Sequence, residues 1–419
     1  MAAPPPLRQI LAKPSQLWRC SRKTVQEQRA TASLAELPRS DLFTVERFML
    51  PRGHRSRVYG SVPLRNPLDE TVVPSREMTE SSFRDALERV VRQQDLDRDT
   101  ARRVMDGIMD GSATPAQIAA LLIALRVKGE TVDEITGMVE SMRGHAVPVS
   151  LSLKAVDTCG TGGDGCGTFN ISTGAALVVA GTGCHVAKHG NRAASSQCGS
   201  ADVLEALGVA ITLPPDGVLR CIEEAHIGFF FAPAYHPAMR HAAPVRKQLG
   251  VRTVFNLIGP LANPARVRHQ TVGVGDVDAA RKVASVLQRL GHAHAFVVCG
   301  PDGLDELGLS DDSICLEVTP SGVREYHVDL TALGLRRASV EQLRGGTADD
   351  NARIIRDVLA GEQGAARDVV VLNAAAALVA ADEAANMCEG AQRAEYSIDS
   401  GAARDALDAL IAVSNRVAS

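Results

Sequence analysis

The sequence predicts a small all-helical N-terminal domain followed by a large α/β domain with a mostly parallel sheet. Residues 81–144 repeat apolar side chains at helical spacing, which indicates packed helices. After residue 154, short runs rich in β-branched and aromatic residues alternate with amphipathic segments, as in parallel strands joined by helical crossovers. A chain of 419 residues is long enough to bury one large core and one smaller core.

Residues 1–77 differ in composition from the rest of the chain. Lys and Arg outnumber Asp and Glu by 13 to 7 there, and nine prolines prevent any long helix. An organellar transit peptide is one interpretation, but Asp41 and Asp69 break the acid-poor pattern of such peptides. We therefore expect a disordered extension or a mis-assigned start, and favour the latter because the residues from Met78 open like a first helix. The charge is too dilute to favour a nucleic-acid-binding tail.

Residues 78–148 form the predicted helical domain. Thr114 as N-cap and Pro115 as first residue begin an apolar helix over 115–125. A helix near 237–250 could join this domain. One apolar strip is either a contact face for a second copy of the chain or the domain's own core, and it consists of Ile118, Leu121, Leu122 and Leu125.

Residues 149–419 form the predicted α/β domain. The runs 314–318 and 323–328, bridged by Pro-Ser-Gly, predict an antiparallel hairpin at one edge of the sheet. In such sheets, ligands bind outside the carboxyl ends of the parallel strands. The parallel strands are expected at 155–158, 185–187, 228–231, 270–274 and 294–298, with helices such as 279–290 between them.

The segment 157–173 is the most informative part of the chain. Its five glycines let the backbone bend through positive φ, so that successive N–H groups can converge on an anion. Asn170 and Ser172 lie where the next helix begins, and the free N–H groups of that helix would extend the anion site. The loop lacks the Gly-Lys-Ser/Thr ending of a P-loop. We interpret it as a phosphate cradle, with a Gly-rich linker as the alternative.

A second polar loop follows one helix later, at the carboxyl end of the strand 185–187. Lys188, His189 and Arg192 bring cationic or donor groups to this edge of the sheet. Taken singly, each would be an ordinary surface or packing residue. Two successive polar loops, one acidic and one basic, favour a substrate site. The hydroxyl groups ahead of the next helix are those of Ser195, Ser196 and Ser200.

Asp305 and Glu306 follow the strand that ends at Val298, in a loop that we expect to be exposed and turn-like. Adjacent carboxylates repel each other, so facing them into one pocket makes sense if a divalent cation holds them. Magnesium with a diphosphate substrate suits such a pair. A solvated acidic turn is the alternative.

Eight motifs occur in order and together resemble the anthranilate phosphoribosyltransferases, over about residue 78 to the C-terminus. They are CGTGGD (159–164), NIST (170–173), KHGNR (188–192), GSADVLEALG (199–208), HPAMR (236–240), PVRKQLG (244–250), TVFNLIGPLANP (253–264) and GLDEL (303–307).

The resemblance implies an activity, a metal and an assembly. The phosphoribosyl group of 5-phosphoribosyl 1-diphosphate would pass to the amine of anthranilate, the second step of tryptophan biosynthesis from chorismate. No dedicated general base is expected, because the neutral aromatic amine attacks before its proton becomes acidic. Two magnesium ions would be held by Ser172, Asp305 and Glu306. A homodimer would form through the helical domain.

The resemblance also implies binding residues, of which Lys188 would neutralise the departing diphosphate. Met239 stands where some members have an aromatic residue. The anthranilate site would comprise Gly160, Asn191, Arg246 and His236. The phosphoribosyl diphosphate site would comprise Gly160, Gly163, Asp164, Thr168, Asn170, Ile171, Ser172, Thr173, Lys188, His189, Gly190, Asn191, Arg192, Ala193, Ala194, Ser195, Ser196 and Ser200. His189 and His236 could instead be structural.

Composition and motifs argue against several other classes of protein. No run approaches the roughly 18 apolar residues of a membrane span. Nine scattered cysteines without a Cys-x-x-Cys pair favour reduced thiols and a cytoplasmic location. A pyrimidine nucleoside phosphorylase would share the fold, but Asn191 and Arg246 argue against it. A nucleic-acid-binding relative would need a basic groove, whereas the net charge is −4.

Overall fold

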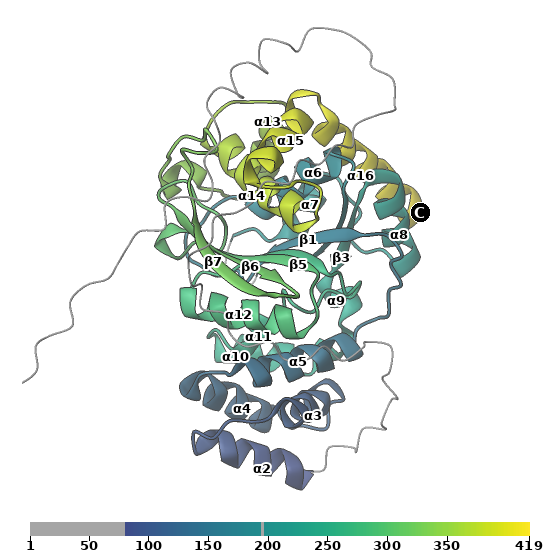
Figure 1. The fold of residues 1–419 in the computed structure, drawn as a ribbon. Helices are drawn as coiled ribbons and strands as arrows, with labels where there is room; N and C mark the ends of the chain where they lie inside the picture. Colours follow the sequence, from purple (N-terminus) through teal and green to yellow (C-terminus); the bar gives the residue numbers. More distant parts are fainter. Residues whose placement is uncertain (1–79, 194–196) are drawn as a thin grey trace, which may run out of the picture.

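The computed structural model describes residues 80–193 and 197–419, so the predictions for residues 1–77 lie outside the described residues. Four helices form the helical N-terminal domain, and the chain that follows builds an α/β domain around one sheet (Figure 1). The four helices are α2 (Glu80–Val91), α3 (Arg98–Met109), α4 (Pro115–Lys128) and α5 (Val132–Gly144). Within the two described ranges, no helix is long and apolar enough to cross a bilayer.

Helix α4 begins where the sequence predicts it. Thr114 Oγ1 accepts from the Gln117 N–H at 3.3 Å, and Gln117 Oε1 accepts from the Thr114 N–H at 2.8 Å, a reciprocal cap. The apolar strip of this helix is the domain's own core, so it cannot contact a second copy. All four of its side chains are at most 1 % exposed: Ile118, Leu121, Leu122 and Leu125.

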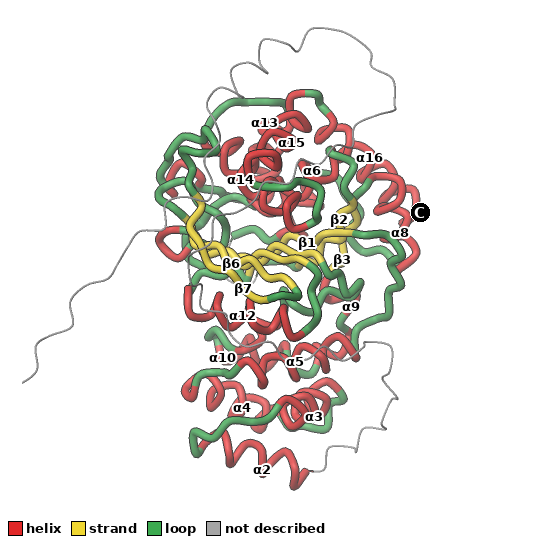
Figure 2. Tube along the Cα trace, in the orientation of Figure 1, coloured by secondary structure: helices red, strands yellow, loops and turns green. Residues whose placement is uncertain are grey.

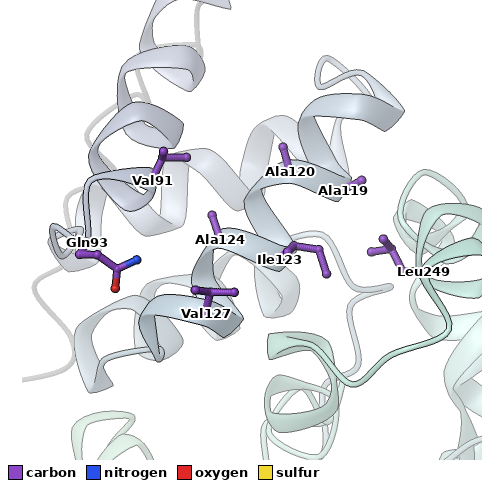
Figure 3. A pocket seen from close by; sticks show the side chains of 8 residues that line it. All are labelled: Val91, Gln93, Ala119, Ala120, Ile123, Ala124, Val127 and Leu249. Atoms are coloured by element: carbon purple, nitrogen blue, oxygen red, sulfur yellow. The ribbon is translucent and has the colours of Figure 1, made fainter.

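A different face of α4 is open and apolar (Figure 3). Val127 is 71 % exposed and Val91 of α2 is 58 % exposed. We call this surface the α4 groove, and it is lined by Val91, Gln93, Ala119, Ala120, Ile123, Ala124, Val127 and Leu249.

All seven predicted strands are present in one sheet of order β3-β2-β1-β4-β5-β6-β7 (Figure 2). Neighbouring strands from β3 to β5 are parallel, and β6 with β7 adds the predicted antiparallel hairpin. β1 and β2 run beyond their predicted ends, so Gly160, Lys188 and His189 lie in strands and not in loops. The strands are β1 (Ala155–Gly160), β2 (His185–Gly190), β3 (Ile227–Phe231), β4 (His269–Gly273), β5 (His294–Cys299), β6 (Ser313–Thr319) and β7 (Gly322–Val328).

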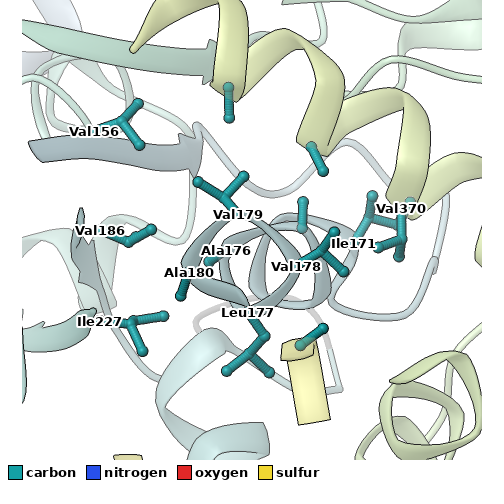
Figure 4. Close-up of a cluster of buried hydrophobic side chains, with 14 of the residues drawn as sticks. Val156, Ile171, Ala176, Leu177, Val178, Val179, Ala180, Val186, Ile227 and Val370 are labelled. Carbon is teal, nitrogen blue, oxygen red and sulfur yellow. The ribbon is translucent and has the colours of Figure 1, made fainter. Parts of the chain in front are cut away.

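Helices cover both faces of the sheet. On one face, α6 (Ile171–Gly181) packs against Val156 and Val186 of the central strands (Figure 4). On the other face, α12 (Val277–Arg289) and α11 (Val254–Ile258) lie between the sheet and the helical domain (Figure 1). A single apolar cluster runs from the strands through these two helices into the helical domain.

The C-terminal helices were not predicted individually. Nearly all side chains of α14 are buried, and most of them are apolar. The helix therefore lacks the amphipathic period by which a helix is predicted from sequence. The last four helices are α13 (Ala348–Leu359), α14 (Ala365–Ala380), α15 (Met387–Asp399) and α16 (Ala402–Ala418). The remaining helices are α7 (Ser200–Ala206), α8 (Pro215–Ala225), α9 (Ala232–Tyr235), the 3₁₀ helix η1 (Pro237–Arg240), α10 (Ala243–Leu249), and the 3₁₀ helices η2 (Pro301–Gly303) and η3 (Val340–Leu343).

The segment predicted as one helix near 237–250 is broken into η1 and α10. Pro244 lies in the first turn of α10, where a missing N–H costs nothing, so the proline marks a new start. Ala242 and Val245 are buried in the same apolar cluster as α4 and α5. The segment therefore packs on the helical domain.

Candidate active site

The Gly-rich loop 161–168 joins β1 to α6 at the carboxyl edge of the sheet. As predicted, its backbone passes through positive φ, with values of 66° at Gly162 and Gly163, 80° at Gly165 and 65° at Gly167. The prediction fails at Gly160, which ends β1 and does not have positive φ. The other predicted residues follow on the same elements: Asp164 and Thr168 in the loop, Asn170, Ile171, Ser172 and Thr173 at the start of α6, Gly190 at the end of β2, Ala193 beyond it, and Ser200 at the start of α7.

Two distant segments hold this loop, and sequence reasoning missed both. Arg252 donates from Nη1 to the Gly162 and Gly163 carbonyls, each at 2.7 Å. The Gly345 N–H donates to the Gly167 carbonyl at 2.9 Å. The only sequence signal for Arg252 was its place directly before the TVFNL motif.

Asp305 and Glu306 reach the Gly-rich loop and the start of α6. Asp305 Oδ2 accepts from the Gly162 N–H at 2.6 Å, and Glu306 Oε1 accepts from the Ser172 N–H at 3.1 Å. A Cβ on Gly160 would come within 2.5 Å of Asp305 Oδ2, so a larger residue there would displace the Asp305 side chain. Both acidic residues are half-buried, so the expected exposure was wrong, while the loop is turn-like as predicted, with the 3₁₀ helix at Pro301–Gly303 followed by bends.

Among the described residues, Arg252 and Lys188 compensate the charges of this pair only in part. Burial and the nearby charge of Asp164 raise the pKa of Asp305 to about 7. Burial likewise raises the pKa of Glu306 to about 8, with Asp305 as the next cause. Two such carboxylates fit a hard cation such as Mg²⁺. The described residues contain no group of three His, Cys, Asp or Glu side chains that could hold a metal alone, so substrate oxygens would complete the coordination.

Lys188 lies behind the loop. Its side chain is almost fully buried, and its Nζ donates to the Thr158 carbonyl at 2.5 Å and lies 3.5 Å from Ser172 Oγ. Burial lowers its pKa, and the charge of Asp157 opposes that shift. We expected Lys188 to neutralise the departing diphosphate, and its ammonium group lies beside Ser172 at the start of α6.

Asp157 was not predicted as a site residue, yet it organises the strand ends. Its buried carboxylate accepts from the His189 N–H at 3.1 Å, from Asn263 Nδ2 at 2.9 Å and from Gln270 Nε2 at 3.1 Å. These bonds fix β1, β2 and β4 relative to one another at the edge where the loops begin.

The basic loop after β2 is partly engaged by its own chain. Arg192 is exposed, and its Nη1 lies 2.9 Å from Asp202 Oδ1 while its Nη2 lies 2.9 Å from Glu205 Oε1. A phosphate contact would have to compete with these pairs. Asn191 is exposed and accepts from the Arg192 N–H at 2.7 Å. The predicted site residues Ala194, Ser195 and Ser196 lie outside the described residues.

His189 and His236 form a ring pair, with centroids 5.2 Å apart and planes at 55°. Both are buried, and neither Nε2 has a hydrogen-bond partner among the residues that the structure describes. Burial lowers the pKa of both imidazoles, that of His236 to about 4. Both rings are therefore neutral at pH 7, and each leaves one polar atom free.

Arg246 of α10 lies over the ring of Phe255, with its guanidinium carbon 5.0 Å from the ring centroid. It is half-buried, and burial lowers its pKa. No carboxylate of the described residues forms an ion pair with it. Its planar fork is therefore available to an anion.

Comparisons with known proteins identify relatives of this chain. Residues 152–404 match the family described as "Glycosyl transferase family, a/b domain", and residues 84–146 match "Glycosyl transferase family, helical bundle domain". The chain is 57 % identical to an anthranilate phosphoribosyltransferase of Thermomicrobium roseum, over 79 % of this chain and 97 % of that protein.

Two solved structures are also similar. The crystal structure of anthranilate phosphoribosyltransferase from Thermus thermophilus is 44 % identical with a TM-score of 0.75, covering 79 % of this chain and 99 % of that one. The enzyme from Saccharomyces cerevisiae in complex with PRPP and Mg is 26 % identical with a TM-score of 0.75, covering 81 % and 100 %.

Proposed function

This chain belongs to the anthranilate phosphoribosyltransferase family, and we propose that the Gly-rich loop, the Asp305–Glu306 pair and Arg246 form one site for its two substrates. The enzyme transfers the phosphoribosyl group of 5-phosphoribosyl 1-diphosphate to the amine of anthranilate and releases diphosphate. The reaction is the second step of tryptophan biosynthesis from chorismate. The supporting observation is the direct contact of both carboxylates with the loop and helix start that would bind phosphate.

The diphosphate side of the site stabilises a leaving group. N–H groups of the Gly-rich loop and of the α6 N-terminus would bind the phosphate oxygens. Magnesium, when bound, neutralises charge on the diphosphate, and Asp305, Glu306 and Ser172 are the residues that would hold it. We propose two ions, since Asp305 and Glu306 contact different segments. Lys188 would add positive charge from behind Ser172.

The anthranilate side of the site would hold a carboxylate and leave the amine free to attack. Arg246 would bind the carboxylate with its fork, and Asn191 would add an amide. The neutral His189–His236 pair would shape the pocket without adding charge. Because the amine attacks in its neutral form, the protein contributes mainly orientation and electrostatic stabilisation.

A direct assay tests the proposed site and activity. Purified enzyme with 5-phosphoribosyl 1-diphosphate and magnesium should remove the fluorescence of anthranilate, and release of one diphosphate per anthranilate should accompany the loss. Phosphorolysis of a pyrimidine nucleoside in place of this reaction would favour the phosphorylase alternative. Salt-sensitive binding of a nucleic acid on filters would favour the alternative of a nucleic-acid-binding relative.

The free thiols of the described cysteines support a reducing, cytoplasmic location.

We also propose that two chains pair through the α4 groove. The exposed apolar side chains of Val91 and Val127 support this, because such patches mark contact sites. Val127→Glu should convert the dimer into monomer at micromolar concentration, since a buried unpaired charge costs several kcal/mol. Light scattering after size exclusion measures the mass. Val323→Glu is the matched control, because Val323 is 37 % exposed and lies outside the groove. A Val127→Glu protein of dimer mass would place the interface elsewhere.

Residues 1–77 should be dispensable for folding and catalysis. The Thermomicrobium relative aligns over 97 % of its own length with only 79 % of this chain, which supports this proposal. A chain shortened to begin at Met78 should keep the parent's melting temperature, mass and turnover. Insolubility or loss of activity in the shortened chain would mean that the extension belongs to the fold.

A further inference from the structure

Asn373 is a buried amide in the apolar helix α14, and it pairs both backbone groups of one residue. Its side chain is 3 % exposed. Its Oδ1 accepts from the Leu307 N–H at 3.0 Å, and its Nδ2 donates to the Leu307 carbonyl at 3.0 Å. The same Nδ2 also donates to the Val369 carbonyl at 2.9 Å. The amide therefore replaces the hydrogen bonds that a neighbouring strand would supply.

Leu307 directly follows the acidic pair. Its side chain is fully buried, so the chain enters the core one residue after Glu306. The carboxylates of the pair accept from the Gly162 and Ser172 N–H groups. The Gly-rich loop and α6 thus hold the two carboxylates, and Asn373 of α14 holds the backbone of the next residue, Leu307.

We propose that Asn373 is a positioning residue for the Asp305–Glu306 carboxylates and thereby sets the affinity of the site for magnesium with a diphosphate. The inference rests on the proposed function and deepens it. A buried polar side chain in an apolar helix is costly unless its bonds are made, and all bonds of this amide go to two backbone positions. Asn373 contacts neither carboxylate, so it acts only through the Leu307 backbone.

The test compares Asn373→Ala and Asn373→Leu with the parent. Calorimetric titration with inorganic diphosphate at graded Mg²⁺ concentrations measures binding without turnover. Both variants should need about tenfold to a hundredfold more Mg²⁺ for half-saturation, as for other partners that orient metal ligands. Leu fills the volume of Asn but leaves the Leu307 groups unpaired, so it should not rescue binding.

A control separates positioning from general stability. Ser414 of α16 is also buried, and its Oγ accepts from the Ala210 N–H at 3.1 Å, a comparable helix-to-loop bond outside the site. Ser414→Ala should lower the melting temperature without changing the Mg²⁺ requirement. If the Asn373 variants likewise lose only thermal stability, Asn373 stabilises the fold without positioning the carboxylates, and the proposal is wrong.

Hydrogen exchange on the parent protein tests the inference even if the variants do not fold. The Leu307 amide should be protected before Mg²⁺ and diphosphate are added, because Asn373 already binds it. Exchange at the rate of an open loop would overturn the proposal. A parent that binds no diphosphate at any Mg²⁺ concentration would contradict the proposed site itself, which is a different failure.

Discussion

Replacing Asp305 with Asn and Glu306 with Gln together should slow phosphoribosyl transfer by about 10²- to 10³-fold or more, the cost of losing a main electrostatic stabiliser of the transition state. The replacements keep shape and can still accept from the Gly162 and Ser172 N–H groups. The fold should therefore persist. What is lost is the negative charge that would hold magnesium against the departing diphosphate.

Two further measurements make this prediction specific. Binding of 5-phosphoribosyl 1-diphosphate should depend less steeply on Mg²⁺ concentration in the double variant than in the parent. With chelator present, the variant should melt at a higher temperature than the parent, because two buried like charges have been removed. Parental turnover with parental Mg²⁺ dependence would show that the pair is only an acidic loop. Ser172 and the diphosphate would then hold any metal.

Arg246→Ala should raise the KM for anthranilate by about 30- to 150-fold, equivalent to about 2–3 kcal/mol for a lost charge-assisted pair. The affinity for 5-phosphoribosyl 1-diphosphate should stay near the parent value, because Arg246 makes no contact with the Gly-rich loop or the acidic pair among the described residues. Steady-state kinetics with each substrate varied in turn separates these effects.

Two variants on the same helix serve as comparisons. Lys247→Ala removes a neighbouring exposed charge and should leave the KM for anthranilate unchanged. Arg246→Lys keeps a charge but loses the fork and the stacking on Phe255, so its KM should be intermediate. An unchanged KM in Arg246→Ala would remove Arg246 from the anthranilate site.

The strands were predictable because their signals are local. The β-rich runs correspond to all seven strands, and the hairpin of β6 and β7 occurs where Pro320 and Gly322 mark a turn. The start of α4 was predictable for the same reason, since Thr114 and Pro115 specify it within one turn. The break between η1 and α10 was missed because the apolar pattern of the segment continues across it. Pro244 alone does not tell whether one helix runs on or a new helix begins there.

The site was predictable only in part. The glycines of the loop and the acidic pair stand out in the sequence, and the structure brings them into contact. Arg252 and Asn373 could not be found in this way. Each acts on a segment far away in the chain, and neither belongs to a motif that we could interpret.

The sequence by itself determined the strands, the start of α4, the mostly parallel class of the sheet and the chemical identity of the loops. These follow from hydrophobic period, caps and glycine conformations that act over a few residues. Only the tertiary structure decided the strand order, the burial of Lys188 and the placing of the acidic pair between α6 and α14. These depend on which distant segments become neighbours, and that choice is made by the packing of the whole core.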